Sequence, residues 1–353
     1  MTEARGLRPV SSVIGCSIGH GDLQVLAAGA GHRAGGAACL GQNAATEGAD
    51  SLGNLMKRGQ VMQEVAILLL GLSPGDEIPS IAQLATRFGV GRGTVQAAFA
   101  LLRADAGLIT DARGPSASRL VACDAAGLWH AAGREGLMLL LPFPYSRRVM
   151  GLATALAELL RRSPVVHSLA YMRGARSRVE ALAAGRADLA VVSALAAREA
   201  LQGTADCEVL MRLGPETYAA GQGWLVRDDF ALWPHRLRVG TDPASTDQSR
   251  LPRLLVPRGV DATFVELPYL RMQGAVASGE VDAVVWPQDV LPQHPGLQVL
   301  PIGSQLPDGA DRAVLLSRRE DRALGALLGR SVTAEQIEAI QREVLSGRRE
   351  PSE

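Results

Sequence analysis

Two segments of this chain, which begin 94 residues apart, share the same pattern of residues. The first is LAAGRADLAVV (182–192) and the second is VASGEVDAVV (276–285). Each combines a helix end, a glycine suited to a left-handed cap, and an aspartate, Asp188 or Asp282, that enters an apolar run typical of a buried strand. Each copy follows a strand, a loop and a helix at a similar distance, so the repeat predicts two similar α/β lobes. Such lobes can close around a ligand by hinge motion.

Apolar runs of strand length alternate with helical patterns from residue 137 onward, which predicts a mostly parallel sheet. The predicted strands are 137–141, 165–171, 189–193, 237–240, 262–267, 281–286 and 313–317, and the predicted helices between them cover about 148–162, 175–184 and 270–278. Two α/β lobes with a cleft between them resemble the type II periplasmic-binding-protein fold, which is also the effector domain of LysR-type regulators. The fold class predicted for 137–353 is therefore a two-lobed α/β ligand-sensing domain.

A second pattern, nearer the N-terminus, predicts a winged helix-turn-helix. Apolar side chains recur at helical spacing over 55–69, 81–88 and 95–102. Ser80 is placed to cap the second of these helices, and a glycine-containing turn at 89–91 separates it from the third. Two short apolar runs around a turn at 113–115 then predict a hairpin. The order of helix, tight turn, helix and hairpin is that of a DNA-binding winged helix.

In such a module the second helix of the pair directs its N-terminal side chains into the major groove. The candidate DNA-binding residues are Ser80, Arg92, Thr94, Gln96 and Arg113. Arginine can pair with guanine or phosphate, threonine with phosphate or a thymine methyl, and glutamine with adenine, while Arg113 on the hairpin could reach a phosphate or the minor groove. Seven basic and five acidic residues lie between Lys57 and Arg119, a surplus of two. We therefore expect weak, salt-sensitive binding per subunit, and a homodimer on a palindromic operator of double-stranded DNA. The alternatives are a three-helix structural or protein-binding module and a winged helix that has lost DNA binding.

The segment 79–121 resembles the GntR-type winged helices. The resemblance is carried by Pro79-Ser80, Leu84-Ala85, Gly89-Val90, Arg92, Thr94-Val95, Leu102, Gly107-Leu108 and Arg113-Gly114. The segment departs from the family at Ala82 and Gln96, where arginine is frequent, and at Gly91, where serine is usual. Gly93 lies inside the recognition helix, at a cost on the order of 1 kcal/mol relative to alanine.

Across about 55–352 the chain resembles the YhfZ-type regulators. The stretches that carry this resemblance are 142–147, 172–175, 178–180, 188–193, 213–215, 217–218, 239–240, 245–248, 282–286 and the tail 346–352. The resemblance implies a transcription regulator in which a GntR-like winged helix is fused to a periplasmic-binding-protein-like domain. It implies no particular ligand.

Ligands of parallel α/β lobes bind beyond the carboxyl ends of the strands, where helix N-termini offer free N–H groups. This rule selects ten candidate ligand-binding residues: Tyr145, Ser146, Arg147, Tyr171, Arg173, Ser193, Asp242, Ser245, Thr246 and Trp286. Arg147 and Arg173 could bind a carboxylate or a phosphate, so the expected effector is a small carboxylate or phosphorylated metabolite. Tyr145 and Trp286 could supply aromatic walls. The alternatives are surface positions for the arginines, helix capping for Ser245 and Thr246, and a core or dimer-interface position for Trp286.

Composition excludes several other classes of protein. A net charge of zero means that any DNA-binding surface must be local. The single lysine, Lys57, lies at the start of the winged helix, which excludes a fused aminotransferase with its lysine Schiff base. The six histidines and four scattered cysteines show no metal-ligand spacing, and no G-x-S-x-G motif occurs, so we expect no enzyme activity, metal or cofactor. No apolar run approaches the roughly 20 residues that span a bilayer, so no membrane partner is expected.

These patterns predict four regions: a glycine- and alanine-rich segment 1–50 that is disordered or an over-long start, a winged helix 51–122, a linker 123–136 and the sensor 137–353. The favoured function is a cytoplasmic DNA-binding transcription regulator. The alternative is a secreted solute-binding lipoprotein anchored at Cys16, because 13–16 resembles a lipoprotein cleavage box. The short apolar stretch before that box is interrupted by Pro9, Ser11 and Ser12, which favours coincidence.

Overall fold

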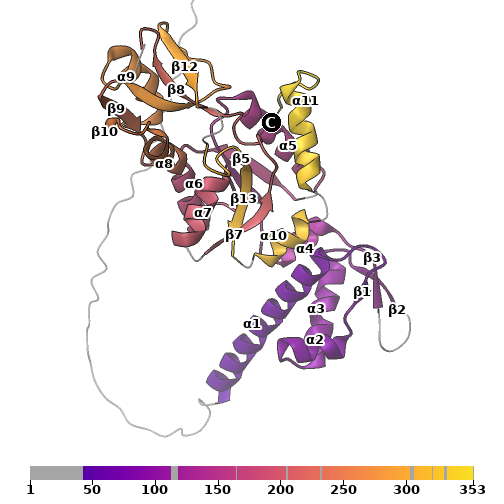
Figure 1. Ribbon diagram of the computed structural model, residues 1–353. Coiled ribbons are helices and arrows are strands. Elements are labelled where there is room, and N and C mark those ends of the chain that lie inside the picture. Colours follow the sequence, from indigo (N-terminus) through magenta and orange to yellow (C-terminus); the bar gives the residue numbers. More distant parts are fainter. Residues whose placement is uncertain are drawn as a thin grey trace, which may run out of the picture. The chain divides into compact units, whose positions relative to one another are not determined.

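The computed structural model describes residues 43–112, 118–163, 165–203, 206–230, 233–302, 306–319, 321–329 and 332–352. Two candidate residues, Arg113 and Cys16, lie outside this set, as do residues 1–42 of the segment predicted to be disordered or an over-long start. The described chain forms a winged helix followed by two α/β lobes, each with its own sheet (Figure 1).

The winged helix contains the three helices and the hairpin that the sequence predicts. Its elements are α1 (Asn43–Leu70), β1 (Glu77–Ile78), α2 (Ile81–Phe88), α3 (Arg92–Asp105), β2 (Ile109–Ala112) and β3 (Ser118–Ala122). The strand β1 pairs antiparallel with β3, so the wing is a three-stranded sheet in the order β1-β3-β2. Helix α2 ends at Gly89, whose φ of 64° suits a residue without a Cβ. Leu84 of α2 and Val95 and Leu102 of α3 are fully buried, which confirms the apolar stripes of both helices.

The stretch predicted to be a linker contains a buried helix, α4 (Ala125–Ala131). Leu128 and Trp129 of this helix are fully buried and share a core with the winged helix and the first lobe. Helix α4 approaches α3 closely, because a Cβ added at Gly127 would lie 2.7 Å from the Cα of Ala106. Seven residues are too few to establish a helical period in the sequence, which is why the helix was not predicted.

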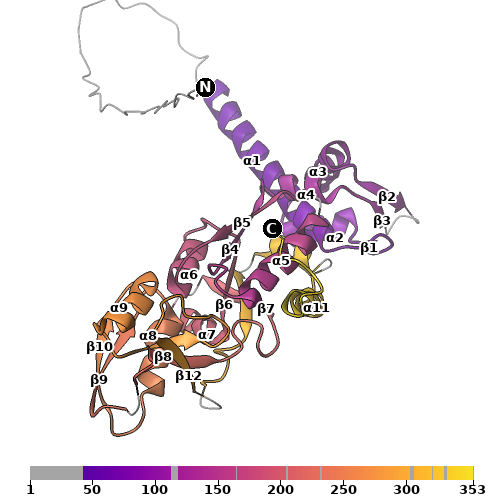
Figure 2. The ribbon, with the colours of Figure 1, turned by 90° about the horizontal axis from the view of Figure 1, so that it is seen from above.

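Lobe 1 has a five-stranded sheet in the order β5-β4-β6-β13-β7. Its strands are β4 (Leu137–Leu141), β5 (His167–Tyr171), β6 (Leu189–Ser193), β7 (Cys207–Arg212) and β13 (Ala313–Arg318). Its helices are α5 (Arg147–Arg161), α6 (Ala175–Ala183), α7 (Ala194–Gly203), α10 (Arg322–Leu328) and α11 (Ala334–Leu345). Helices α5 and α11 pack side by side (Figures 1 and 2). The strand β13 is antiparallel to both of its neighbours.

Lobe 2 repeats this arrangement with the sheet order β10-β9-β11-β8-β12. Its strands are β8 (Gln222–Arg227), β9 (Arg236–Thr241), β10 (Asp261–Glu266), β11 (Ala283–Pro287) and β12 (Leu297–Pro301), and its helices are α8 (Thr246–Leu255), the 3-10 turn η1 (Tyr269–Arg271) and α9 (Met272–Ser278). The strand β8 is antiparallel to both neighbours, as β13 is in lobe 1. The chain passes from lobe 1 to lobe 2 before β8 and returns to lobe 1 before β13. These two strands occupy the same antiparallel position in their sheets, which confirms two mostly parallel lobes of the same topology.

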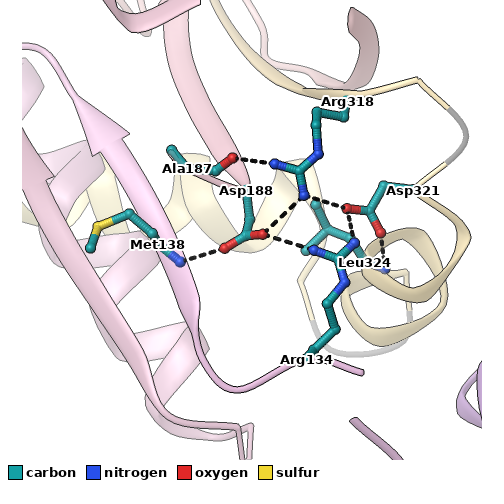
Figure 3. A network of polar contacts seen from close by, with 7 residues as sticks. All are labelled: Arg134, Met138, Ala187, Asp188, Arg318, Asp321 and Leu324. Carbon is teal, nitrogen blue, oxygen red and sulfur yellow. Dashed lines mark hydrogen bonds and ion pairs between the residues drawn. The ribbon is translucent and has the colours of Figure 1, made fainter. Parts of the chain in front are cut away.

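The repeated aspartates hold equivalent strands together in the two lobes. Asp188 accepts a hydrogen bond from the Met138 N–H at 2.8 Å and donates its own N–H to the Met138 carbonyl at 2.9 Å. Asp282 makes the same pair of bonds with Arg238, at 2.7 and 2.8 Å. In lobe 1 the carboxylate of Asp188 also pairs with Arg134 and Arg318, and both arginines reach Asp321 (Figure 3). The repeat is therefore structural, and it fixes β4 against β6 in lobe 1 and β9 against β11 in lobe 2.

Candidate functional site

A cavity with an empty volume of about 760 Å³, including its open mouth, is lined by both lobes. Lobe 1 contributes the segments that follow β4 and β5 and the N-terminus of α6. Lobe 2 contributes the segments that follow β9, β10 and β11 and the N-terminus of α8. The cavity thus lies at the carboxyl ends of parallel strands in both sheets, where a ligand of an α/β domain is expected.

Five of the predicted ligand-binding residues line this cavity: Tyr145, Ser146, Arg173, Asp242 and Ser245. Ser146 and Ser245 also cap helices, because their hydroxyls accept hydrogen bonds from the N–H groups of Val149 and Gln248. Arg173 lies 3.6 Å from the buried carboxylate of Asp242, so this ion pair joins the two lobes across the cavity.

The other five predicted ligand-binding residues lie beside the cavity or away from it. Arg147 is exposed and donates to the carbonyl of Val344 at 2.9 Å. Tyr171 packs against the core of lobe 1, and Thr246 is buried in the first turn of α8. Ser193 is fully buried and reaches the cavity through one hydrogen bond. Trp286 is buried and stacks on the ring of Tyr269, so it supports the cavity wall from behind.

The cavity also contains polar residues that sequence reasoning missed: Arg178, Tyr218, Gln222, Asp247, Gln248 and Tyr269. The carboxyl-end rule could have found Tyr269, because this residue follows β10. Asp247 and Gln248 lie in the first turn of α8, one and two residues beyond the predicted Thr246. Gln222 is the first residue of β8, a strand that the sequence did not predict, and no sequence pattern indicated that Gln222 belongs to the site.

The lobe 1 wall of the cavity is rich in hydrogen-bond donors. Arg178 is 2% exposed and donates to the Val191 carbonyl at 2.9 Å, the Met172 carbonyl at 2.6 Å and the Tyr218 hydroxyl at 3.2 Å. A guanidinium has five N–H bonds, so two of them have no hydrogen-bond partner among the described residues. The N-cap of α6 is Gly174, and the described residues provide no side-chain cap for this helix. The first N–H groups of α6 and the positive end of its dipole therefore adjoin the cavity.

The lobe 2 wall is rich in hydrogen-bond acceptors. Asp247 is buried, and the Ser193 hydroxyl donates to its Oδ1 at 2.7 Å. Burial raises the pKa of Asp247 from 3.8 to about 6, against the opposing effects of the Ser193 hydrogen bond and the Arg178 charge. Within the described residues, the Oε1 atoms of Gln222 and Gln248 are buried without a hydrogen-bond partner. Asp242 differs from these groups, because it accepts the N–H groups of Ala244 and Tyr269.

A ladder of aromatic rings borders the cavity on one side. The centroids of Phe143 and Tyr145 are 5.5 Å apart, those of Tyr145 and Tyr269 5.4 Å, and those of Tyr269 and Trp286 5.0 Å with the rings nearly parallel. Burial raises the pKa of the Tyr269 phenol, and burial also raises that of Tyr145, although the Arg173 charge opposes it. Both phenols are therefore neutral at physiological pH, and the ladder forms an uncharged wall.

The winged helix presents two of its candidate DNA-binding side chains to solvent. Arg92 and Gln96 of α3 are exposed, and Thr94 is partly buried. Val95, between Thr94 and Gln96 in the sequence, is fully buried. Ser80 forms a capping box with Gln83: the Ser80 hydroxyl accepts the Gln83 N–H at 3.3 Å, and the Ser80 backbone N–H donates to Gln83 Oε1 at 2.8 Å.

Neither a metal cluster nor a membrane span occurs in the part of the chain that the structure describes. No group of three or more His, Cys, Asp or Glu side chains in that part is placed to hold a metal ion. Its helices are all too short or too polar to cross a membrane.

These parts define the class of protein: a winged-helix DNA-binding module joined to a two-lobed domain of the solute-binding fold. Residues 58–116 match the family model of the bacterial regulatory proteins of the gntR family, and residues 124–353 match that of the YhfZ C-terminal domain. The second match covers more than half of the chain, and the chain belongs to the YhfZ family.

Similar proteins include one curated relative and several solved structures. The chain is 32% identical over 303 residues to the uncharacterized protein YhfZ of Escherichia coli K12, covering 84% of this chain and 98% of that one. The crystal structure of YhfZ from Shigella flexneri is 31% identical with a TM-score of 0.51, covering 62% of this chain and 94% of that one. The periplasmic aliphatic sulphonate binding protein SsuA of Escherichia coli is 21% identical with a TM-score of 0.42, covering 60% and 75%.

Proposed function

We propose that this protein is a cytoplasmic transcription regulator, not an enzyme, whose two-lobed domain binds a small anionic metabolite and thereby modulates operator binding. The observation that carries the effector hypothesis is the donor-rich wall of the cavity. There the uncapped N-terminus of α6, Arg173 and Arg178 adjoin one another. Backbone N–H groups at a helix N-terminus and guanidinium groups both bind carboxylates and phosphates.

The DNA-binding hypothesis rests on α3. Arg92 and Gln96 are exposed on the helix that enters the major groove in related winged helices, and both have side chains that can bond to base edges. The charge surplus of the module is small, so a single copy neutralises few phosphates. We therefore propose that a homodimer binds a palindromic operator, with Thr94 and the wing residue Arg113 as further contacts. Ser80 serves first as the cap of α2.

Operator binding is tested with the full chain. Binding sites are selected from a random duplex library, and dissociation constants are measured by fluorescence anisotropy at fixed salt concentration. The variant Arg92→Ala should bind the selected site about 5- to 150-fold more weakly, because one good base contact contributes about 1–3 kcal/mol. The control Arg258→Ala removes the same charge from an exposed position in lobe 2 and should bind normally. Unchanged affinity of Arg92→Ala would contradict the assignment of α3.

Effector binding is tested by thermal shift against a panel of small carboxylates and phosphorylated metabolites. A ligand at 100 times its Kd stabilises the native state by about 2.7 kcal/mol. The variant Arg173→Ala should lose this stabilisation and keep ligand-free operator binding, since it removes only one cation from the cavity wall. If the ligand still stabilises Arg173→Ala, Arg173 does not belong to the binding site.

The alternative of a secreted lipoprotein anchored at Cys16 gives the winged helix no role. The match of 58–116 to the gntR family favours the regulator. Cell fractionation distinguishes the two, because an anchored lipoprotein would sediment with membranes.

A further inference from the structure

The two walls of the cavity have opposite hydrogen-bonding character. The lobe 1 wall presents the two unused N–H bonds of Arg178, the guanidinium of Arg173 and the uncapped N-terminus of α6. The lobe 2 side is lined by Asp247, Gln222 and Gln248, and the Oε1 atoms of the two glutamines are buried without a hydrogen-bond partner among the described residues. An anion alone would occupy the first wall and leave the second unsatisfied.

The three acceptors are buried polar groups in need of a donor. Gln222 and Gln248 are each 6% exposed, and neither Oε1 has a partner among the described residues. Asp247 is 8% exposed and receives one hydroxyl, from Ser193. No hydrogen bond joins Arg178 to these three acceptors, and its three hydrogen bonds go to two carbonyls and a tyrosine. Buried polar groups of this kind are normally satisfied by a partner, and buried carboxylates by a cation.

An ammonium group matches this set of acceptors in charge and in number. It carries one positive charge and three N–H donors, and the acceptors are one carboxylate and two amide oxygens. A hydroxyl would bring one donor and no charge. A guanidinium would bring five donors to three acceptors.

We infer that the effector is a zwitterion of the amino-acid type, with its carboxylate on the lobe 1 wall and its ammonium against Asp247, Gln222 and Gln248. This inference rests on the proposed function, because it specifies the ligand of the same cavity. The aromatic ladder that includes Phe143, Tyr145 and Tyr269 borders the remaining space and would contact the side chain of the amino acid. A ligand bound in this position connects the two lobes, since its carboxylate and its ammonium contact different walls.

The test uses the full chain and the L and D forms of the proteinogenic amino acids in a thermal-shift screen. The amino acid that stabilises most is then compared by titration calorimetry with two analogues of the same skeleton. One analogue is the carboxylic acid without the amine, and the other is the amine without the carboxylate. We expect both analogues to bind at least 100-fold more weakly, because each leaves one set of buried polar groups unpaired.

A variant pair tests the ammonium site directly. Asp247→Asn keeps the shape of the side chain and an oxygen for the Ser193 hydroxyl but removes the negative charge. It should weaken amino-acid binding at least 30-fold and leave ligand-free operator binding intact, which shows that the chain is folded. The control Asp261→Asn removes the same charge from an exposed position in lobe 2 and should bind normally.

Two results would overturn the inference. The first is a carboxylic acid without an amine that binds as tightly as its amino acid, in which case an anionic effector stands and the zwitterion falls. The second is the absence of stabilisation by any amino acid in the screen. The proposed function is judged separately, by operator binding and by stabilisation from any small carboxylate, amino acids included, or phosphorylated metabolite.

Discussion

The Asp247→Asn variant should make the ligand-free protein more stable at neutral pH. Asp247 is buried, and its pKa is about 6 in the folded chain against an ordinary value of 3.8. The difference is about two pKa units, and one unit corresponds to about 1.4 kcal/mol. Keeping this carboxylate charged in the unliganded cavity therefore costs about 3 kcal/mol. Asparagine is neutral at every pH, so it removes that cost while retaining the hydrogen bond from Ser193.

The sign of the pH dependence follows from proton linkage. Because the folded pKa is raised, the native state binds more protons than the unfolded state between pH 3.8 and about 6. The contribution of Asp247 to stability is therefore unfavourable above pH 6 and disappears as the pH falls towards 4. The charged groups that act on Asp247 are Arg178, which lowers its pKa, and Glu199, which raises it.

The assay is urea unfolding of both proteins at a series of pH values from 4 to 7.5, followed by far-UV circular dichroism. The quantity of interest is the free energy of unfolding of Asp247→Asn minus that of the wild type, because the other titrating groups cancel in this difference. It should rise from near zero at pH 4 to about 3 kcal/mol at pH 7. The control Asp261→Asn changes an exposed side chain and should give a flat difference. A flat difference for Asp247→Asn, or one that grows as the pH falls, would refute the reasoning.

Three further substitutions test packing and capping. Ser80→Ala removes the capping box of α2 and should cost about 1 kcal/mol, seen as a lower Tm. Gly127→Val places side-chain atoms against the backbone of Ala106 and should destabilise the fold by about 1–3 kcal/mol in urea unfolding, whereas an unaltered midpoint would contradict the close approach of α4 to α3. Gly174→Ala directs a Cβ at the Ala244 carbonyl of the other lobe, at a φ of 82° that favours glycine, so it should weaken effector binding in calorimetry without changing ligand-free operator affinity.

The sequence predicts those elements whose side chains follow a clear period. The continuous apolar runs at 137–141 and 189–193 became the central strands β4 and β6 with the predicted bounds. The edge strands β7 and β12 were not predicted, although β5 and β10, the other edge strands of the two sheets, were. The strand β8 is buried, but it begins with Gln222 and a glycine, which hides it among loop signals.

The candidate site could be predicted in its location but only partly in its residues. The carboxyl-end rule depends on topology alone, and it selected Arg173 and Asp242, which face each other across the cavity. The rule did not select Arg178, which lies on α6. Its part in the site can be recognised only once the carbonyls that accept from its guanidinium are placed. Ser193 was selected as a ligand contact, and its hydroxyl bonds to Asp247 instead. Whether a residue contacts the ligand or holds another residue that does so depends on side-chain geometry, which sequence patterns do not contain.

The cavity and the winged helix are connected through the sheet of lobe 1. Its strand β4 ends at the cavity, and Met138 near the start of β4 bonds to Asp188, whose partner Arg134 also binds Asp321, the N-cap of α10 (Figure 3). The guanidinium of Arg134 lies 5.5 Å from the ring of Trp129 in α4, inside the core that contains α3 of the winged helix. Helix α10 reaches α1 through the ion pair between Arg322 and Glu64, at 2.8 Å. Packed side chains and paired charges thus join lobe 1 to the winged helix, which gives the proposed effect of a ligand on DNA binding a physical connection.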